Sequence, residues 1–145
     1  MISLQGKVAL VTGASRGIGK AIATQLKALG ATVIGTATSP KGADNIGEYL
    51  GEGNGLVLNV TDDNSIAEMF AAIKEKHGAI DILVNNAGIT RDNLFMRMKD
   101  EEWQDIIETN LSSVFKLSKA VMRPMMKNRN GRIINIGSVV GTMGN

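Results

Sequence analysis

Cysteine is missing from the 145 residues, so the sequence offers no disulfide, no thiolate metal ligand and no cysteine nucleophile. A cysteine-free composition suits the reducing cytoplasm, where we expect the protein to work. No cluster of side chains has the spacing of metal ligands, so we expect no metal site. The single histidine, His77, falls at the end of an expected helix, where we expect it to contact helix-end carbonyl groups.

A strong charge of one sign is also missing. The formal net charge is +2, and lysine and arginine are dispersed among acidic residues, which excludes a basic stripe for nucleic acid. No apolar run approaches the ~18–20 residues that cross a bilayer. The N-terminal segment MISLQGKVAL lacks the basic and apolar regions of a signal peptide. We therefore expect a soluble protein with no nucleic-acid partner and no membrane partner.

Glycine is abundant, with 17 residues, and short apolar runs alternate with segments of helical period. The expected strands are Lys7–Thr12, Ala31–Thr36, Gly55–Val60, Ile80–Val84 and Gly131–Gly137. The expected later helices are Ala43–Leu50, a helix capped by Asp62 or Asp63 and closed by Gly78, and Glu101–Lys127. This alternation predicts an α/β fold, a doubly wound, Rossmann-like parallel sheet with strand order 3-2-1-4-5. We expect residues 1–145 to form one domain.

Two helices show the clearest apolar spacing. In the helix after the earliest strand, the apolar residues are Ile18, Ile22, Leu26 and Leu29, and Gly30 follows as a cap. In the longest helix, one face carries Trp103, Ile106, Ile107, Leu111, Val114, Leu117, Val121, Met122 and Met125. Asn110 stands midway between Trp103 and Leu117 on that face, so we expect it to face the core, where a buried amide needs partners.

A glycine-rich turn, Thr12–Gly19, joins the earliest strand to its helix. Gly13 permits the tight turn, Gly17 lets the backbone approach a pyrophosphate, and Gly19 allows close packing of the helix. Free N–H groups and the positive end of the helix dipole favour phosphate there. The spacing G-x-x-x-G-x-G differs from the common dinucleotide fingerprint, and the alternative is an ordinary glycine-rich turn.

The end of the second strand, Thr36–Ser39, bears on the choice between NAD and NADP. NAD sites usually place an acid there to bind the ribose 2′-hydroxyl, and the next acid in this sequence is Asp44. Hydroxyl groups and Arg16 would instead accommodate a 2′-phosphate. The pattern predicts NADP(H), and the alternative is that Thr36 and Thr38 only end the strand.

The order of these motifs resembles the short-chain dehydrogenase/reductase family. The marks are TGxxxGxG ending at Gly19, NNAG at Asn85–Gly88, Asn110 within a helix, and Ser138 after the fifth strand. The segments ASRGIG, GTATS, LVNNAGITRDNLFMRMKDEEW, ETNLSSVFKLSKAVMRPMMK and GRIINIGSVVGTMGN are similar to the bacterial 3-oxoacyl-[acyl-carrier-protein] reductases. The resemblance covers the whole chain.

The resemblance implies an oxidoreductase that reduces a 3-oxoacyl group on acyl carrier protein to the 3-hydroxyacyl form, with NADPH as donor, in fatty-acid synthesis. It also implies a homotetramer. The residues that match the cofactor contacts of the family are Gly13, Ser15, Arg16, Gly17, Ile18, Gly19, Thr38, Asn59, Val60, Asn86, Ala87 and Gly88. Many relatives carry Asp where Asn59 stands.

Two further residues match the family's catalytic positions. Asn110 matches the helix residue that supports a water and proton relay, and the alternative is an Asn that bonds only across the core. Ser138 matches the serine that stabilises the developing oxyanion, and the alternative is an ordinary turn serine. Lys127, Arg129 and Arg132 form a weak basic excess that would steer the acidic carrier protein, and the alternative is a solvated loop.

The family's Tyr-x-x-x-Lys motif is absent, because the only tyrosine, Tyr49, has no lysine four residues later. We therefore expect these 145 residues to be C-terminally incomplete relative to the family, with little reductase activity. We also expect the fifth strand to be an uncovered edge that promotes association. The alternatives to the carrier-protein reductase are an inert NADPH-binding or assembly module and a reductase of a CoA thioester or another ketone.

Overall fold

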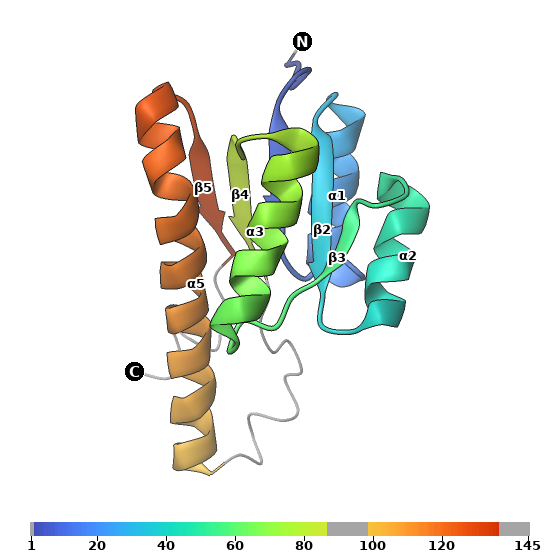
Figure 1. Cartoon of the computed structure of the whole chain (residues 1–145). Helices are drawn as coiled ribbons and strands as arrows, with labels where there is room; N and C mark the ends of the chain where they lie inside the picture. Colours follow the sequence, from blue (N-terminus) through green and yellow to red (C-terminus); the bar gives the residue numbers. More distant parts are fainter. Residues whose placement is uncertain (1, 87–98, 137–145) are drawn as a thin grey trace.

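The computed structural model describes residues 2–86 and 99–136, and only the backbone of Trp103. Its parallel sheet has the order β3-β2-β1-β4-β5 (Figure 1). The strands are β1 (Val8–Val11), β2 (Thr32–Ala37), β3 (Gly55–Val57), β4 (Ile82–Asn85) and β5 (Arg132–Asn135). The helices are α1 (Gly17–Ala28), α2 (Pro40–Leu50), α3 (Asp63–His77) and α5 (Asp100–Asn128). The expected α/β fold and strand order 3-2-1-4-5 are confirmed.

Helices cover both faces of the sheet, α1 and α2 on one and α3 and α5 on the other (Figure 1). Alternate residues of β1 divide between the two cores: Ala9 and Val11 belong to the first, and Leu10 to the second. A strand buried on both faces has no polar side, which is why these strands are continuously apolar.

Two element boundaries lie three residues from the sequence expectation, and the others that differ lie within two. Helix α2 begins at Pro40 and not at Ala43, because Ser39 caps it by accepting a hydrogen bond from Gly42 N at 3.1 Å and proline suits the first helical position. Strand β3 ends at Val57 and not at Val60. Its extension turns away because Asn59 Oδ1 accepts from Thr61 N at 3.0 Å, a local bond that replaces strand pairing.

Ile18 is 61% exposed, so of the four apolar residues at helical spacing it does not belong to the buried face of α1. The buried residues of α1 are Gly19 and Ala23. Small residues at these positions let the helix backbone lie close to the structure beneath it. The apolar spacing alone could not show that the first turn of the helix faces outward.

Helix α5 buries Leu117, Val121 and Met125, but Leu111 and Met122 are 65% and 47% exposed. The prediction of one continuous buried face was therefore wrong for these two residues. A helix of 29 residues is about 44 Å long, whereas a four-residue strand spans only ~13 Å. The sheet accordingly covers only part of α5, whose first half extends beyond the strands (Figure 1).

Candidate cofactor site

The glycine-rich turn lies at the carboxyl end of β1, where the order of the sheet reverses. Strand β1 pairs with β2 on one side and with β4 on the other, and the helices that follow these strands cover opposite faces. In such sheets a crevice opens outside the carboxyl ends of the strands at this point, and ligands bind there.

Hydrogen bonds from both neighbouring strands hold the turn. From the β2 side, Thr36 accepts from Ala14 N at 2.9 Å through its carbonyl oxygen and from Gly13 N at 3.4 Å through Oγ1. From the β4 side, Asn86 N donates to Thr12 Oγ1 at 2.9 Å, and Asn86 Nδ2 donates to Gly13 O at 3.1 Å. The turn is thus fastened to both strands before any ligand binds.

The three glycines meet different demands. Gly13 and Gly17 have φ of 64° and 61°, a left-handed conformation that other residues adopt only with strain. A Cβ added at Gly17 would meet nothing within 4 Å, so the space above it is open. A Cβ at Gly19 would collide with the Gly13 carbonyl and the Asn86 amide. Gly19 is needed for close packing, as expected, although its neighbours are the turn and Asn86.

The N-termini of α1 and α5 have no side-chain cap, unlike those of α2 and α3, and that of α1 follows the glycine-rich turn. Ser39 caps α2, and the side chain of Asp62 caps α3 by accepting from Asn64 N and Ser65 N. The N-cap of α1 is Arg16, whose side chain forms no capping bond within the described residues. The first-turn N–H groups of a helix have no intrahelical partners and attract anions. Together with the open space above Gly17, this terminus fits a cofactor pyrophosphate.

Thr36 and Thr38 occupy different environments at the end of β2. Thr36 is 1% exposed, and its hydroxyl is committed to Gly13 N, so its role is to hold the turn. Thr38 is exposed one residue beyond the strand, and Arg16, the N-cap of α1, is also exposed. Thr38 and Arg16 therefore have exposed side chains here, whereas the Thr36 hydroxyl group is already hydrogen-bonded within the protein.

The other predicted cofactor residues lie at the ends of neighbouring strands. Asn59 is exposed beyond β3, and its Oδ1 accepts from both Thr61 N and Thr61 Oγ1, the latter at 2.7 Å. The side chain of Asn59 is thus engaged within its own turn. Val60 packs against the core on the α3 side. Asn86 contacts the turn directly, whereas Ala87 and Gly88 lie outside the described residues.

The two predicted catalytic residues are placed unequally. Asn110 shares a helical face with Ser113 and Leu117 of α5, but it is only partly buried, so the expectation that it faces the core holds only in part. It lies in the half of α5 that extends beyond the strands. Ser138 lies outside the described residues.

Three polar residues build the site in roles that the sequence analysis did not assign to them. Thr12 and Thr36 end apolar strands with buried hydroxyl groups, and Asn85 is 6% exposed at the end of β4. Asn85 Nδ2 donates to Asn135 Oδ1 at 2.8 Å, which joins β4 to β5. A polar residue at the carboxyl end of an apolar strand was the available signal.

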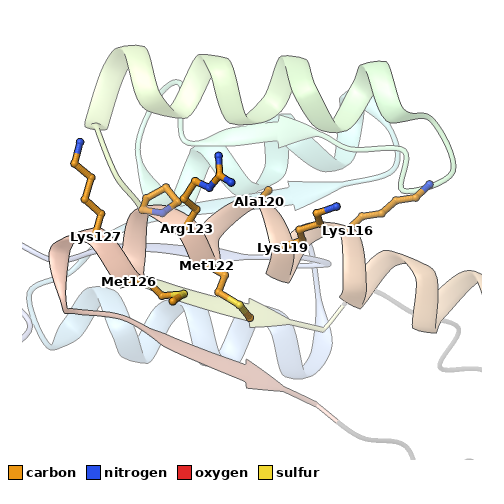
Figure 2. A pocket seen from close by; sticks show the side chains of 8 residues that line it. Lys116, Lys119, Ala120, Met122, Arg123, Met126 and Lys127 are labelled. Atoms are coloured by element: carbon orange, nitrogen blue, oxygen red, sulfur yellow. The ribbon is translucent and has the colours of Figure 1, made fainter.

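A second feature of the surface lies along the outer side of α5, away from the turn. A depression of about 1130 Å³ is lined by Lys116, Lys119, Ala120, Met122, Arg123, Pro124, Met126 and Lys127 (Figure 2). Phe115 and Met126, 64% and 72% exposed, also face outward here. We call this the basic-apolar surface. It holds no acidic side chain and no paired catalytic groups among its lining residues, so the glycine-rich turn remains the better candidate for chemistry.

His77 lies at the C-terminal end of α3. The sequence had led us to expect that His77 contacts a helix-end carbonyl group. Its Nε2 instead lies 3.3 Å from Oδ1 of Asn54, a loop side chain. Burial, and then the charge of Lys76, lower the pKa of His77.

Residues 2–86 and 99–136 contain no group of three or more potential metal ligands. No helix among them has the length and apolarity to cross a bilayer.

Comparison with known proteins agrees with this arrangement. The family model of the short-chain dehydrogenases matches residues 7–145. The chain is 72% identical to the 3-oxoacyl-[acyl-carrier-protein] reductase FabG of Salmonella typhimurium and 71% identical to that of Escherichia coli K12, over 99% of this chain and 59% of each relative. Identity to the Pseudomonas aeruginosa protein of the same name is 64%, over 99% of this chain and 60% of the relative. The chain thus spans about three fifths of the length of these relatives. It belongs to the short-chain dehydrogenase family.

Proposed function

We propose that the protein carrying this chain is an NADPH-dependent reductase of 3-oxoacyl groups held on acyl carrier protein, and that residues 1–145 are its NADP-binding domain. The observation that carries the proposal is the α1 N-terminus without a side-chain cap, with open space above Gly17, at the switch point of the sheet. The names of the relatives supply the substrate class.

The preference for NADPH rests on charge at the end of β2. Arg16 and Thr38 are exposed beside the turn, and the next acid along the chain after β2 is Asp44, within α2. An acid at position 38 would repel a 2′-phosphate. We therefore assign Arg16 and Thr38 to the adenosine phosphate and the α1 N-terminus to the pyrophosphate.

The proposed chemistry assigns one role to each remaining residue. The bound cofactor supplies a hydride to the substrate carbonyl. Ser138 donates a hydrogen bond to the carbonyl oxygen and stabilises the negative charge that develops there. Asn110 holds a water molecule that belongs to the proton-relay path. Its place in the half of α5 beyond the strands supports this role over that of an Asn enclosed in the core.

The experiment is to measure NADPH oxidation by the purified whole protein that carries this chain, with a 3-oxoacyl group on carrier protein and, separately, on CoA. We expect turnover with the carrier-bound substrate at a higher kcat/KM than with CoA. Binding of NADPH without turnover would favour the inert module, and a preference for the CoA thioester would favour the related reductase. Absence of NADPH binding would overturn the proposal.

A variant sharpens the assignment of the cofactor. Thr38→Asp places a carboxylate beside the proposed 2′-phosphate, and we expect it to weaken NADPH binding by about 100-fold through like-charge repulsion. Thr38→Ala is the matched control and should weaken it only a few-fold. NADH binding should be unchanged or improved by Thr38→Asp, because NADH has no 2′-phosphate. Equal losses for both cofactors would contradict the assignment.

We propose that the acidic carrier protein is steered by Lys127, Arg129 and Arg132. Lys127 lies at the end of α5 on the basic-apolar surface, and Arg129 and Arg132 are exposed just beyond it. Reversing all three charges should raise the KM for the carrier-bound substrate about tenfold and leave that for a CoA thioester unchanged. Added salt should reduce the difference in this KM between the wild type and the triple variant. Carrier binding that survives the triple reversal would exclude this role.

We also propose that the protein is a cytoplasmic homotetramer. The outward apolar side chains of α5, Leu111, Phe115, Met122 and Met126, support association of subunits. Analytical ultracentrifugation of the protein and of Phe115→Asp tests this. We expect a tetramer that the variant disrupts, and a monodisperse monomer would contradict the proposal.

A further inference from the structure

Tyr49 lies in α2, on the side of the glycine-rich turn away from β4. It is partly buried and packs against the core that contains Ala14, Ile46 and Leu50. Nothing in the family resemblance assigns it a role.

Three contacts tie Tyr49 to the turn and to α1. Its hydroxyl donates a hydrogen bond to the carbonyl oxygen of Ala14, inside the turn. Lys20 Nζ, from the first half of α1, lies 5.2 Å from the centre of the ring. Lys27 Nζ donates to the Tyr49 carbonyl at 2.8 Å. Only the first of these contacts involves the hydroxyl group.

The hydroxyl bond fixes the orientation of one peptide unit. Ala14 N donates to Thr36 O at 2.9 Å, so this residue is held through both its N–H and its carbonyl group. In a planar trans peptide the carbonyl and the next N–H point in opposite directions. Because the Ala14 carbonyl points to Tyr49, the Ser15 N–H points away from α2. Burial raises the pKa of Tyr49 to about 12, so the phenol remains a donor at neutral pH.

We propose that Tyr49 is a positioning residue for the cofactor: by holding the Ala14 carbonyl, it sets the turn in the conformation that receives the cofactor phosphates, without touching the cofactor itself. The inference rests on the proposed function. A freed Ala14 carbonyl would be buried without a partner at a residue that is 0% exposed, so the peptide would rotate to find one. Rotation would turn the Ser15 N–H, and binding would then have to restore the original conformation.

The test uses Tyr49→Phe, which keeps the ring and the contact with Lys20 and removes only the hydroxyl. We expect the Kd for NADPH, measured by calorimetry well below the unfolding temperature, to rise about five- to tenfold, the size of one hydrogen bond. In turnover the KM for NADPH should rise similarly while kcat at saturating NADPH stays near the wild-type value. If Tyr49 only stabilised the fold, Tyr49→Phe would not raise the KM for NADPH at an unchanged kcat.

Two controls separate positioning from lost stability. Lys27→Met removes a different bond to Tyr49, and Ile73→Val weakens the core on the opposite face, where Ile73 is 2% exposed. Both should bind NADPH as the wild type does. If Tyr49→Phe lowers the Tm but binds NADPH like Ile73→Val, the inference is overturned and the proposed function stands. If the wild type itself fails to bind NADPH, the proposed function is overturned, and the inference with it.

Discussion

The two neighbours of β4 are built from similar residues and end in different environments. On the β1 side, Val11 pairs in register with Val84, and both side chains are 0% exposed. On the β5 side, Ile134 pairs with the same Val84 and is 45% exposed. Strand β1 lies between two strands and under helices on both faces, whereas β5 has β4 as its one paired neighbour in the described chain. Burial in a sheet is therefore set by the neighbours of a strand more than by its own sequence.

The glycine-rich turn follows the buried strand β1, whereas the basic-apolar surface lies along α5, on the side of the sheet where β5 is exposed. Bonds from Thr36, Tyr49 and Asn86 hold the turn. On the exposed side, the one salt bridge in the part of the chain that the structure describes joins Lys116 of α5 to Asp63 of α3 at 2.8 Å. The two side chains are 35% and 80% exposed, so the pair adds little stability. The glycine-rich turn is therefore held by several hydrogen bonds, whereas the outer side of α5 carries exposed apolar and basic side chains.

The largest effect is expected from a substitution at Gly19, which packs against the glycine-rich turn. In Gly19→Ala the new methyl group collides with the Gly13 carbonyl, and the turn has to shift. We expect a loss of about 1–3 kcal/mol in the free energy of unfolding. A displaced turn should also weaken NADPH binding by about tenfold or more, because a hydrogen bond to a charged phosphate contributes about 1.5–3 kcal/mol. Urea unfolding and calorimetry measure the two effects.

The matched control is Gly47→Ala in α2, where a Cβ meets nothing within 4 Å. Alanine is the better helix former, so this variant should gain ~0.5–1 kcal/mol and bind NADPH normally. Near-normal binding by Gly19→Ala would show that the close approach at this position is not needed for the site.

A smaller effect compares the two partners across β4 and β5. Val84→Ala removes two methyl groups from a fully buried site, and we expect it to cost about 2 kcal/mol. Ile134→Ala removes more carbon from a half-exposed site and should cost under ~1 kcal/mol. Urea unfolding of both variants gives the comparison. Equal costs would mean that another strand or another subunit covers β5 in solution.

The smallest effect concerns His77, at the end of α3. Its pKa in the folded protein is below the ordinary 6.5, so the unfolded chain takes up the proton first. The contribution of neutral His77 is therefore complete above about pH 6.5 and declines as the pH falls below it. His77→Gln, which keeps a donor for Asn54, should flatten the stability profile in that range. An unchanged profile would place the pH dependence elsewhere.

Local patterns predicted the fold well because their causes are local. The apolar runs gave five strands near their observed places, and Asp62 and Gly78 mark the ends of α3 as expected. The doubly wound parallel sheet followed from strand–helix alternation and from the handedness of the crossovers, which need no side-chain detail. The glycine pattern located the turn, since a left-handed φ at Gly13 and Gly17 is a demand that glycine meets without strain.

Predictions failed where a residue depends on distant parts of the chain. Leu111 has helical spacing but lies in the half of α5 beyond the strands, and Met122 is 47% exposed although its neighbour Val121 is buried. Asn59 leaves the line of β3 and bonds Thr61. The division of labour between Thr36 and Thr38 was likewise hidden, because the partner of Thr36 is Gly13, 23 positions earlier. Tyr49 offered no sequence signal at all, since its bond to Ala14 joins α2 to a turn 35 residues away.

The sequence by itself determined the class of fold, the position of the glycine-rich turn and the family. Periodicity and turn chemistry depend on residues close together in the sequence, and the order of the motifs can be read along the chain. Only the tertiary structure decided which polar groups hold the turn, which faces of α1 and α5 remain exposed, and that α1 begins without a side-chain cap. The physical reason is that burial and hydrogen-bond partners depend on segments that meet only after the crossovers place them side by side.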